Sequence, residues 1–353
     1  MTDSATAIGG GGGRNNSRQM NYRYTLLNGS KTDTILRAIL CKTTLIQSIF
    51  WYSILLIVFS ILYFTIAYVK YALNTTCPDI PSVDTAEIAE QLKKEPKNVA
   101  ILVTGTGKYA QLAMELVDSG RQYFCRGNNK ECLAVTYIVF TDVPKEQLIL
   151  SAGPEFTKDH HVVFIHQQRR GWPDDSMKRF HSYLKQKETL EMFDFIISMD
   201  ADLRFIDHVE LSELYSDLTA ILHPGYTVTN RWDLPFERKE PRSKAFVPAM
   251  ASCRYFTAAI WAGEREHFIR ALRTLVWQLD SDAELLGVNF TAAWHDESHL
   301  NRYFVDNHPS RILLPTYYYP EDVKMYPMIY KPILNIPQKI LAVRKNQQLM
   351  RNE

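Results

Sequence analysis

The sequence has 353 residues and a hydrophobic fraction of 46%, which is enough for one large or two modest domains with a hydrophobic core. It contains 40 Lys and Arg residues against 39 Asp and Glu residues, so its formal charge of +1 gives no global case for a nucleic-acid partner. Its five cysteines lack Cys-x-x-Cys spacing, which argues against a disulfide-built fold and against a zinc module.

The N-terminal part of the chain predicts a tail followed by a membrane span. Residues 1–44 include the glycine run Gly9–Gly13 and a polar composition that cannot bury a core, so a disordered tail is expected. Residues 45–69 contain the almost continuously apolar segment Ile49–Val69, and about 20 apolar residues cross a bilayer as a helix. A buried core helix is the alternative, but little on this segment is polar enough to face water.

Charges around the span predict its orientation. Basic residues outnumber the acidic Asp3 and Asp33 before it, so the positive-inside rule places the N-terminus in the cytosol and the rest of the chain in the lumen or outside the cell. Residues 70–96 read as a solvated stem, and residues 97–353 as the catalytic domain. The basic residues in question are Arg14, Arg18, Arg23, Lys31, Arg37 and Lys42.

Beyond the stem, short apolar runs alternate with helical patterns. A helix is expected over Gln111–Val117, ending at Gly120. This alternation predicts an α/β architecture with a mostly parallel sheet, in which ligands bind at the carboxyl ends of the strands. The expected strands are Val99–Val103, Ala134–Phe140, Val162–Ile165 and Phe195–Met199.

The last of these runs ends in Asp200-Ala201-Asp202. Residues i and i+2 of an extended backbone project from one face, so the two carboxylates repel each other unless a cation lies between them. A divalent cation with hard oxygen ligands is the functional interpretation. The structural alternative is a turn cap with a solvated neighbour, and the Asp-x-Asp pattern alone does not separate the two. The position at a strand end favours the metal.

Three other segments surround this motif. The turn Thr104–Tyr109 follows the first strand, lacks the third glycine of a dinucleotide fingerprint, and reads first as a strand-end turn. The basic segment Arg169–Arg179 suits a diphosphate or is simply a solvated loop. His223 lies in a His-Pro-Gly turn, from which it could bind a polar ligand, although a lone His is more often structural.

A second polar cluster opens a predicted helix at Trp294-His295-Asp296-Glu297. Leu300, Tyr303 and Phe304 follow at helical spacing and are expected to dock this helix. The Trp294 ring could stack on a sugar, and the two carboxylates could accept hydrogen bonds or act on a positively charged sugar transition state. The structural alternative is a helix-capping cluster with one buried Trp.

In this order, Asp-x-Asp, His-Pro-Gly and Trp-His-Asp-Glu-Ser-His-Leu-Asn closely resemble glycosyltransferase family six, over residues from Asn98 to the C-terminus. The resemblance implies a type II Golgi membrane protein with a GT-A fold. It also implies transfer of galactose or N-acetylgalactosamine from a UDP-sugar to a galactose-terminated glycan, with retention, in α linkage (α1,3 being the family expectation), using Mn²⁺.

The same resemblance implies roles for individual residues. Asp200 and Asp202 would hold Mn²⁺, and His223 and Trp294 would contact the acceptor. Glu297 would lie beneath the anomeric carbon as a nucleophile or as a stabiliser of an oxocarbenium-like state, two roles that the sequence leaves open. The matching donor contacts are Tyr109, Arg179, Thr257, Ala259, Asp296, Lys345 and Arg351.

Some segments depart from the family pattern. Thr104–Thr106 replaces an apolar pair that faces the base, Ala249–Arg254 replaces a stretch that is usually acidic, and Pro235 replaces a residue near the acceptor. The resemblance implies that Ala259 favours galactose, because an Ala at this position accompanies galactose in several members and its methyl group leaves less room for an N-acetyl group. These departures keep open a second hypothesis, a catalytically impaired member that binds glycans or acts as a scaffold. A retaining glycoside hydrolase is more distant, because it leaves the Asp-x-Asp motif unused.

Overall fold

The computed structural model describes residues 22–74, 77, 79–126, 131–152, 160–227, 232–249, 251–325 and 331–345. The chain divides into two compact units, residues 1–76 and residues 77–353, each with its own internal contacts. Arg351, which is predicted to contact the donor, lies outside the described residues.

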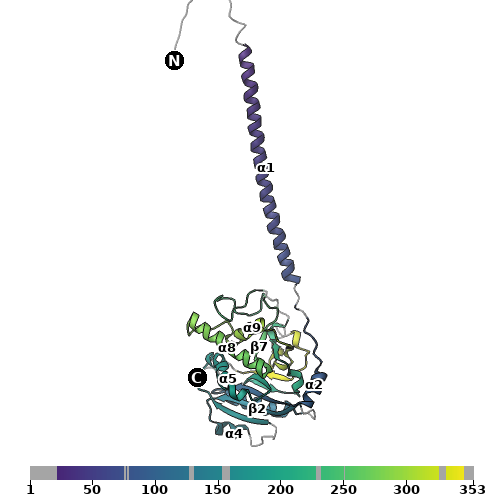
Figure 1. The fold of residues 1–353 in the computed structure, drawn as a ribbon, viewed down its shortest axis with the longest axis vertical. Coiled ribbons are helices and arrows are strands. Elements are labelled where there is room, and N and C mark those ends of the chain that lie inside the picture. Colours follow the sequence, from purple (N-terminus) through teal and green to yellow (C-terminus); the bar gives the residue numbers. More distant parts are fainter. Residues whose placement is uncertain are drawn as a thin grey trace, which may run out of the picture. The chain divides into compact units, whose positions relative to one another are not determined.

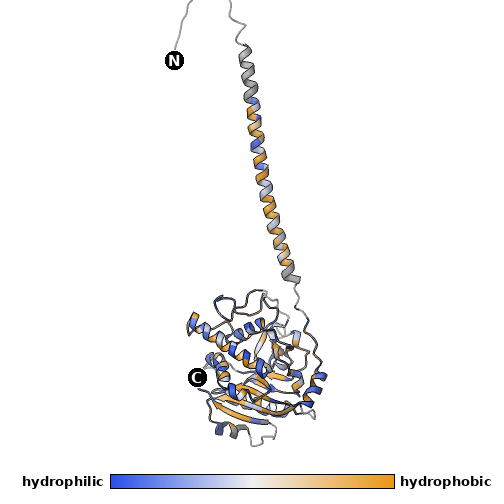
Figure 2. Ribbon diagram, in the orientation of Figure 1, coloured by the Kyte–Doolittle hydropathy of each residue, from blue (hydrophilic) through white to orange (hydrophobic). Residues whose placement is uncertain are grey.

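The first unit contains a single long helix in its described part, α1 (Tyr22–Asn74). Its segment Asp33–Val69 is long and apolar enough to cross a membrane, and its large side chains, including Trp51 and Tyr63, are exposed. Figure 2 shows hydrophobic residues along most of this helix. The helix extends beyond the predicted span of residues 45–69 on both sides, because no proline or glycine pair interrupts the flanking turns.

The second unit begins at Cys77, earlier than the expected boundary at residue 97. A disulfide joins Cys77 to Cys253, and helix α2 (Thr85–Lys94) places Leu92 in the core with 2% exposure. Residues 77–96, most of the segment expected to be a solvated stem, therefore belong to this unit. The disulfide also gives a structural use to the unusual stretch around Ala249–Arg254.

The predicted mostly parallel sheet is confirmed. Seven strands run in the order β3-β2-β1-β4-β7-β6-β8; β1, β2, β3 and β4 are parallel neighbours, and only β7 runs antiparallel to its partners. The four expected strands all form. The bounds are β1 (Lys97–Thr104), β2 (Cys132–Thr141), β3 (His160–His166), β4 (Phe195–Asp200), β6 (Leu218–Leu222), β7 (Phe256–Glu264) and β8 (Arg311–Leu313).

Both faces of this sheet are buried, as a parallel sheet requires. Alternate residues of β1 point to opposite sides: Val99 packs in one core cluster with α3, and Ala100 packs in the other with α5 and α8. Figure 1 shows α5, α8 and α9 gathered on one side of the sheet. The helices are α3 (Tyr109–Tyr123), α4 (Lys145–Ala152), α5 (Asp174–Lys185), α6 (Lys187–Leu190), α7 (Leu211–Leu214), α8 (Arg265–Leu286) and α9 (His295–Asp306).

The expected helix end at Gly120 is wrong, because α3 continues to Tyr123. Gly120 instead allows close packing within the fold. A Cβ atom at this position would lie 2.5 Å from the hydroxyl oxygen of the buried Tyr137 side chain. The glycine therefore marks a close helix–strand contact rather than a helix terminus.

A small second sheet ties the C-terminal segment to the Asp-Ala-Asp turn. Its order is β5-β10-β9, with β5 (Leu203–Phe205), β9 (Tyr319–Pro320) and β10 (Ile340–Ala342). The pairing of β10 with β5 is antiparallel and continues beyond the strand, since the Val343 N–H donates to the Asp202 carbonyl at 2.9 Å. Residues after β10 consequently begin beside Asp202. Short 3-10 helices complete the described chain: η1 (Pro224–Tyr226), η2 (Pro315–Tyr317), η3 (Val323–Met325) and η4 (Lys331–Ile333).

Candidate active site

A cavity of about 190 Å³ opens at the carboxyl ends of β1 and β4, where an α/β sheet binds its ligands. Five of the residues singled out in the sequence meet there, although they come from four different segments of the chain. They are Tyr109, Arg179, Asp200, Asp202 and Lys345.

The two carboxylates of the Asp-x-Asp motif both line this cavity, and each is paired with its own cation. Asp200 ends β4 and forms an ion pair with Arg179, whereas Asp202 follows a turn and pairs with Lys345. Burial raises the pKa of Asp202, and Lys345 opposes that rise. The repulsion expected between the carboxylates is thus relieved by two side chains. Their oxygens remain a donor set suited to a hard divalent cation.

Lys345 also contacts the predicted nucleotide end of the cavity. Its Nζ lies 4.8 Å from the centroid of the Tyr109 ring, a cation–π arrangement, and Tyr109 is the first residue of α3. The C-terminal segment that leaves β10 therefore reaches both Asp202 and Tyr109. Lys345 thus lines the cavity together with both of these residues.

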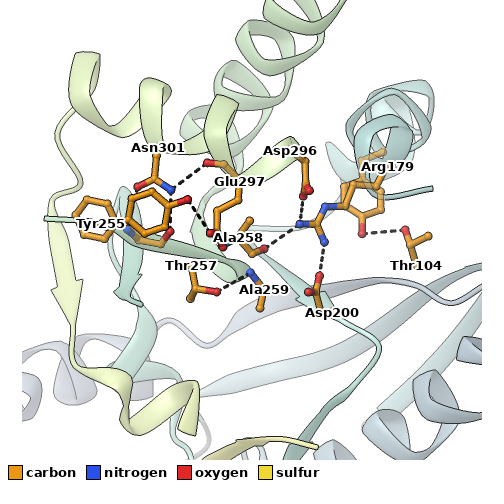
Figure 3. A network of polar contacts seen from close by, with 12 residues as sticks. Thr104, Arg179, Asp200, Tyr255, Thr257, Ala258, Ala259, Asp296, Glu297 and Asn301 are labelled. Atoms are coloured by element: carbon orange, nitrogen blue, oxygen red, sulfur yellow. Dashed lines mark hydrogen bonds and ion pairs between the residues drawn. The ribbon is translucent and has the colours of Figure 1, made fainter. Parts of the chain in front are cut away.

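Arg179 is the hub of the site (Figure 3). This residue of α5 is 5% exposed and donates to Asp200, to Asp296 and, at 3.1 Å, to the carbonyl oxygen of Ala258. Burial alone would lower the pKa of Arg179, but Asp296 and Asp200 raise it above its ordinary value, so the guanidinium stays charged. One side chain therefore joins α5, β4, β7 and α9.

Substitution of Arg179 by Met is expected to destabilise the protein by ~3–5 kcal/mol, because it strands two acceptor carboxylates, one of them nearly fully buried. Urea unfolding of the purified chain measures the effect. Arg242→Met is the matched control, because Arg242 pairs with Glu240 on the surface and its loss should leave the urea midpoint close to that of the unaltered protein. Equal midpoints for the two variants would contradict the role of Arg179 as a hub.

Glu297 lies on the first turn of α9 and is held at both oxygens (Figure 3). The Tyr255 hydroxyl donates to Oε1 at 2.8 Å, and the Ala258 N–H donates to Oε2 at 2.9 Å. Burial raises the pKa of Glu297 to about 7, while these two hydrogen bonds favour its charged form and limit the rise. The carboxylate is thus oriented, and it titrates near neutral pH.

The backbone of Ala258 connects Glu297 to the cavity. Its carbonyl accepts from Arg179 and its N–H donates to Glu297, so one residue links the Glu297 carboxylate to the Arg179 guanidinium. Asn301 fixes the same region: its side chain exchanges two hydrogen bonds with the backbone of Phe256, at 2.9 and 2.8 Å. Helix α9 is thereby locked onto the start of β7.

The candidate acceptor residues are His223 and Trp294, and His223 lies near Tyr255. The His223 ring is 5.9 Å from that of Tyr255, which bonds Glu297. His223 Nδ1 accepts from the Gly225 N–H at 3.2 Å, and burial lowers the pKa of His223 to about 4, so the ring is neutral. Trp294 caps α9 and is 48% exposed, a flat apolar surface open to a ligand.

The predicted docking face of α9 is confirmed, since Leu300, Tyr303 and Phe304 are all buried.

Only part of the basic segment Arg169–Arg179 lines the cavity. Among the described residues that line the cavity are Arg169 and Arg179, but neither Arg170 nor Lys178.

The turn between β1 and α3 explains one departure from the family pattern. The Thr104 hydroxyl donates to Tyr183 at 3.1 Å, and the Thr106 hydroxyl donates to Asp175 at 2.9 Å. A Cβ at Gly105 would lie 2.8 Å from both Ala113 Cβ and the Tyr109 carbonyl oxygen, so this glycine is required by the approach of α3. Both threonine hydroxyls thus donate to other side chains of the protein, and both residues also line the cavity.

A separate group of possible metal ligands lies at the opposite end of the sheet. Asp217, Glu264 and His267 have ligand atoms within 4.8 Å of one another. Glu264 pairs in register with Phe195, the first residue of β4, whereas Asp200 is the last. This exposed group is therefore distinct from the cavity that contains Asp200 and Asp202.

Sequence reasoning assigned no role to Tyr255, and only its place two residues before Thr257 could have drawn attention to it. The backbone of Ala258 was missed as well, because a backbone hydrogen bond leaves no mark in the identity of the residue. The Ala259 N–H donates to the Thr257 hydroxyl at 3.1 Å, and both of these predicted donor-sugar contacts are buried; neither is among the residues that line the cavity.

Comparisons with known proteins identify the family of the chain. The model of "Glycosyltransferase family 6" matches residues 82–352. Over 270 residues, the chain is 30% identical to histo-blood group ABO system transferase 1 of Rattus norvegicus, covering 74% of this chain and 71% of that protein. Two human proteins are also similar: globoside alpha-1,3-N-acetylgalactosaminyltransferase 1 (29% over 243 residues; 68% and 66% covered) and alpha-1,3-galactosyltransferase 2 (27% over 279 residues; 77% and 75% covered).

The family match covers most of the chain, and the sheet, the two buried faces and the cavity at the strand ends are those of an α/β nucleotide-sugar fold. The resemblance predicted from the motifs is confirmed. The chain is a glycosyltransferase with the GT-A fold, and it belongs to glycosyltransferase family 6.

Proposed function

We propose that the protein is a retaining, Mn²⁺-dependent glycosyltransferase that transfers galactose or N-acetylgalactosamine from a UDP-sugar to a galactose-terminated glycan, forming an α1,3 linkage. The observation that carries the proposal is the continuous hydrogen-bonded path from Glu297 through Ala258 and Arg179 to Asp200. It holds a carboxylate of near-neutral pKa at a fixed position relative to the Asp-x-Asp cavity.

In this proposal the cavity binds the donor. Tyr109 faces the base, Lys345 and Arg351 bind the diphosphate, and Asp200 and Asp202 hold the cation. When bound, the cation supplies Lewis-acid neutralisation of the departing UDP. Lys345 moves from Asp202 to the phosphate oxygens as the donor enters. The donor sugar is contacted by Arg179, Thr257, Ala259 and Asp296.

Glu297 faces the anomeric carbon, where it acts as a nucleophile or stabilises an oxocarbenium-like state. Both roles require the ionised carboxylate, oriented by Tyr255 and the Ala258 N–H. His223 and Trp294 place the acceptor galactose on the open side of Glu297. The side chain of Ala259 favours galactose as the transferred sugar.

The activity should fall as pH drops through the pKa of Glu297, about 7 in the structure. Tyr255→Phe removes a hydrogen bond that favours the charged form, so the midpoint of the acid limb of kcat/KM is expected to move up by ~0.5–1 pH unit. Profiles recorded with saturating Mn²⁺ measure the shift. Tyr215→Phe is the matched control, because Tyr215 donates to Glu264 at the far end of the sheet. If the acid limb of kcat/KM had the same midpoint in Tyr255→Phe and in the unaltered enzyme, Tyr255 would not set the pKa of Glu297.

The direct test is release of UDP from UDP-galactose and from UDP-N-acetylgalactosamine in the presence of Mn²⁺ and a panel of galactose-terminated glycans, with the anomeric configuration of the product determined. Transfer with retention supports the proposal. Acceptor binding without donor binding or turnover would instead support the catalytically impaired scaffold. The internal hydrogen bonds of Thr104 and Thr106 weaken that second reading, since these departures do not remove residues from the cavity.

We also propose that the protein is a single-pass type II Golgi membrane protein, with residues 1–44 cytosolic, a span within 45–69, and a stem and catalytic domain in the lumen. Disulfides Cys77–Cys253 and Cys125–Cys132 support a lumenal domain, because such bonds persist in oxidising compartments. The catalytic unit then starts at Cys77.

A further inference from the structure

A second cavity, of about 540 Å³, is larger than the candidate donor cavity and differs from it in character. We call it the apolar groove. Its walls are mainly hydrocarbon, with Asp79 and Arg254 as its charged members. Its apolar side chains include Ile80, Leu222, Tyr226, Leu314, Ile333 and Ile336.

The apolar groove is continuous with the candidate acceptor residues. Leu222 and Tyr226, on either side of His223 in the chain, both line it. The Tyr226 ring lies 4.9 Å from the His223 ring, and its ring centroid is 5.3 Å from that of Tyr255, which bonds Glu297. A ligand whose terminal sugar contacts His223 therefore has Tyr226 as its next neighbour and the groove beyond it.

The walls of the groove are held in place before any ligand binds. The Cys77–Cys253 disulfide forms part of the lining, and Ile333 is 2% exposed within a small core cluster that includes Tyr319 and Val323. Leu314, in contrast, is 50% exposed. A preformed apolar surface that stays in contact with water gains free energy when hydrocarbon covers it.

We propose that the apolar groove binds the aglycone of the acceptor, the hydrocarbon portion attached beyond its short sugar chain, as in a glycolipid. This inference rests on the proposed function, since it takes the acceptor galactose to lie at His223. The lining decides the chemical class: apolar side chains outnumber the charged pair of Asp79 and Arg254, so the groove favours hydrocarbon over further sugar rings, which need many hydrogen-bonding partners.

The test compares the methyl and butyl glycosides of one galactose-terminated disaccharide with the full-length protein. Calorimetry is done with UDP and Mn²⁺, and transfer assays are done with UDP-galactose or UDP-N-acetylgalactosamine and Mn²⁺. The short butyl chain adds three methylene groups and is expected to lower the acceptor Kd by about tenfold. Leu314→Ser should abolish this preference and leave the Kd of the methyl glycoside unchanged. Leu133→Ser, at a side chain 61% exposed on β2, is the matched control and should retain the preference.

Equal affinity for the two glycosides, or a preference that survives Leu314→Ser, would overturn the groove assignment. The calorimetric arm needs no turnover, so the two proposals can fail separately. Transfer to both glycosides with equal Kd overturns the groove alone, whereas a butyl preference that Leu314→Ser removes, without transfer to any acceptor, supports the groove and overturns the enzymatic proposal. A longer sugar chain that improves binding where butyl does not would identify the groove as a saccharide subsite instead.

Discussion

Glu297→Gln is expected to lower kcat by ~10³-fold or more, because the amide carries no charge to attack or stabilise the anomeric carbon. The substitution preserves the shape of the side chain, and its carbonyl can still accept from Tyr255 or from the Ala258 N–H. The affinity for the UDP-sugar should therefore change little. Initial rates and calorimetric donor titrations distinguish a lost chemical step from a lost binding site.

Glu264→Gln is the matched control for this variant. Glu264 also accepts a hydrogen bond from a tyrosine hydroxyl, that of Tyr215, but it lies at the amino end of β4. Its kcat should remain within about twofold of the unaltered enzyme, as expected for a change remote from the reacting atoms. If Glu297→Gln retained normal turnover, the assignment of Glu297 would be untenable.

Asp202→Asn is expected to weaken Mn²⁺ binding in the presence of UDP by at least ~10²-fold, because a neutral amide replaces a charged oxygen ligand. Addition of a chelator to the unaltered enzyme should abolish transfer in the same way. Calorimetric titration of Mn²⁺ into the UDP complex measures the affinity directly.

Asp217→Asn separates the two candidate metal sites of the molecule. Asp217 belongs to the exposed group with Glu264 and His267, at the opposite end of the sheet from Asp202. Turnover and Mn²⁺ affinity should be unaltered in this variant. If turnover and Mn²⁺ affinity were lost in Asp217→Asn but kept in Asp202→Asn, the assignment of the metal to the Asp-x-Asp motif would be wrong.

The sequence contains enough information to predict the layers and one half of the site. Apolar runs of strand length give β1 and β4, and the rule that ligands bind at strand ends places Asp200 and Asp202 at the cavity. Recognition of the motif extended this to Arg179, Asp296 and Glu297. Arg179 and Asp296 are 117 positions apart, and only the fold explains why they contact each other.

Other features leave no periodic signal in a single chain. The Cys77–Cys253 disulfide spans 176 positions, so cysteine spacing could not reveal it or show that the domain begins before residue 97. Gly120 reads as a helix end because glycine favours that position, yet tertiary packing against Tyr137 decided its use. Tyr255 belongs to no recognised motif, and its importance arises from its hydrogen bond to the Glu297 carboxylate on α9.

The peptide unit of Ala258 has a consequence for how such an enzyme can change its substrate. Arg179 and Glu297 contact only the carbonyl and the N–H of Ala258, so these two hydrogen bonds do not depend on which side chains residues 257–259 carry. The flanking side chains of Thr257 and Ala259, proposed to meet the donor sugar, take no part in these two contacts with Arg179 and Glu297. Donor preference and catalytic competence are therefore separable under mutation, and a single substitution at residue 259 should exchange one sugar for another without a compensating change elsewhere.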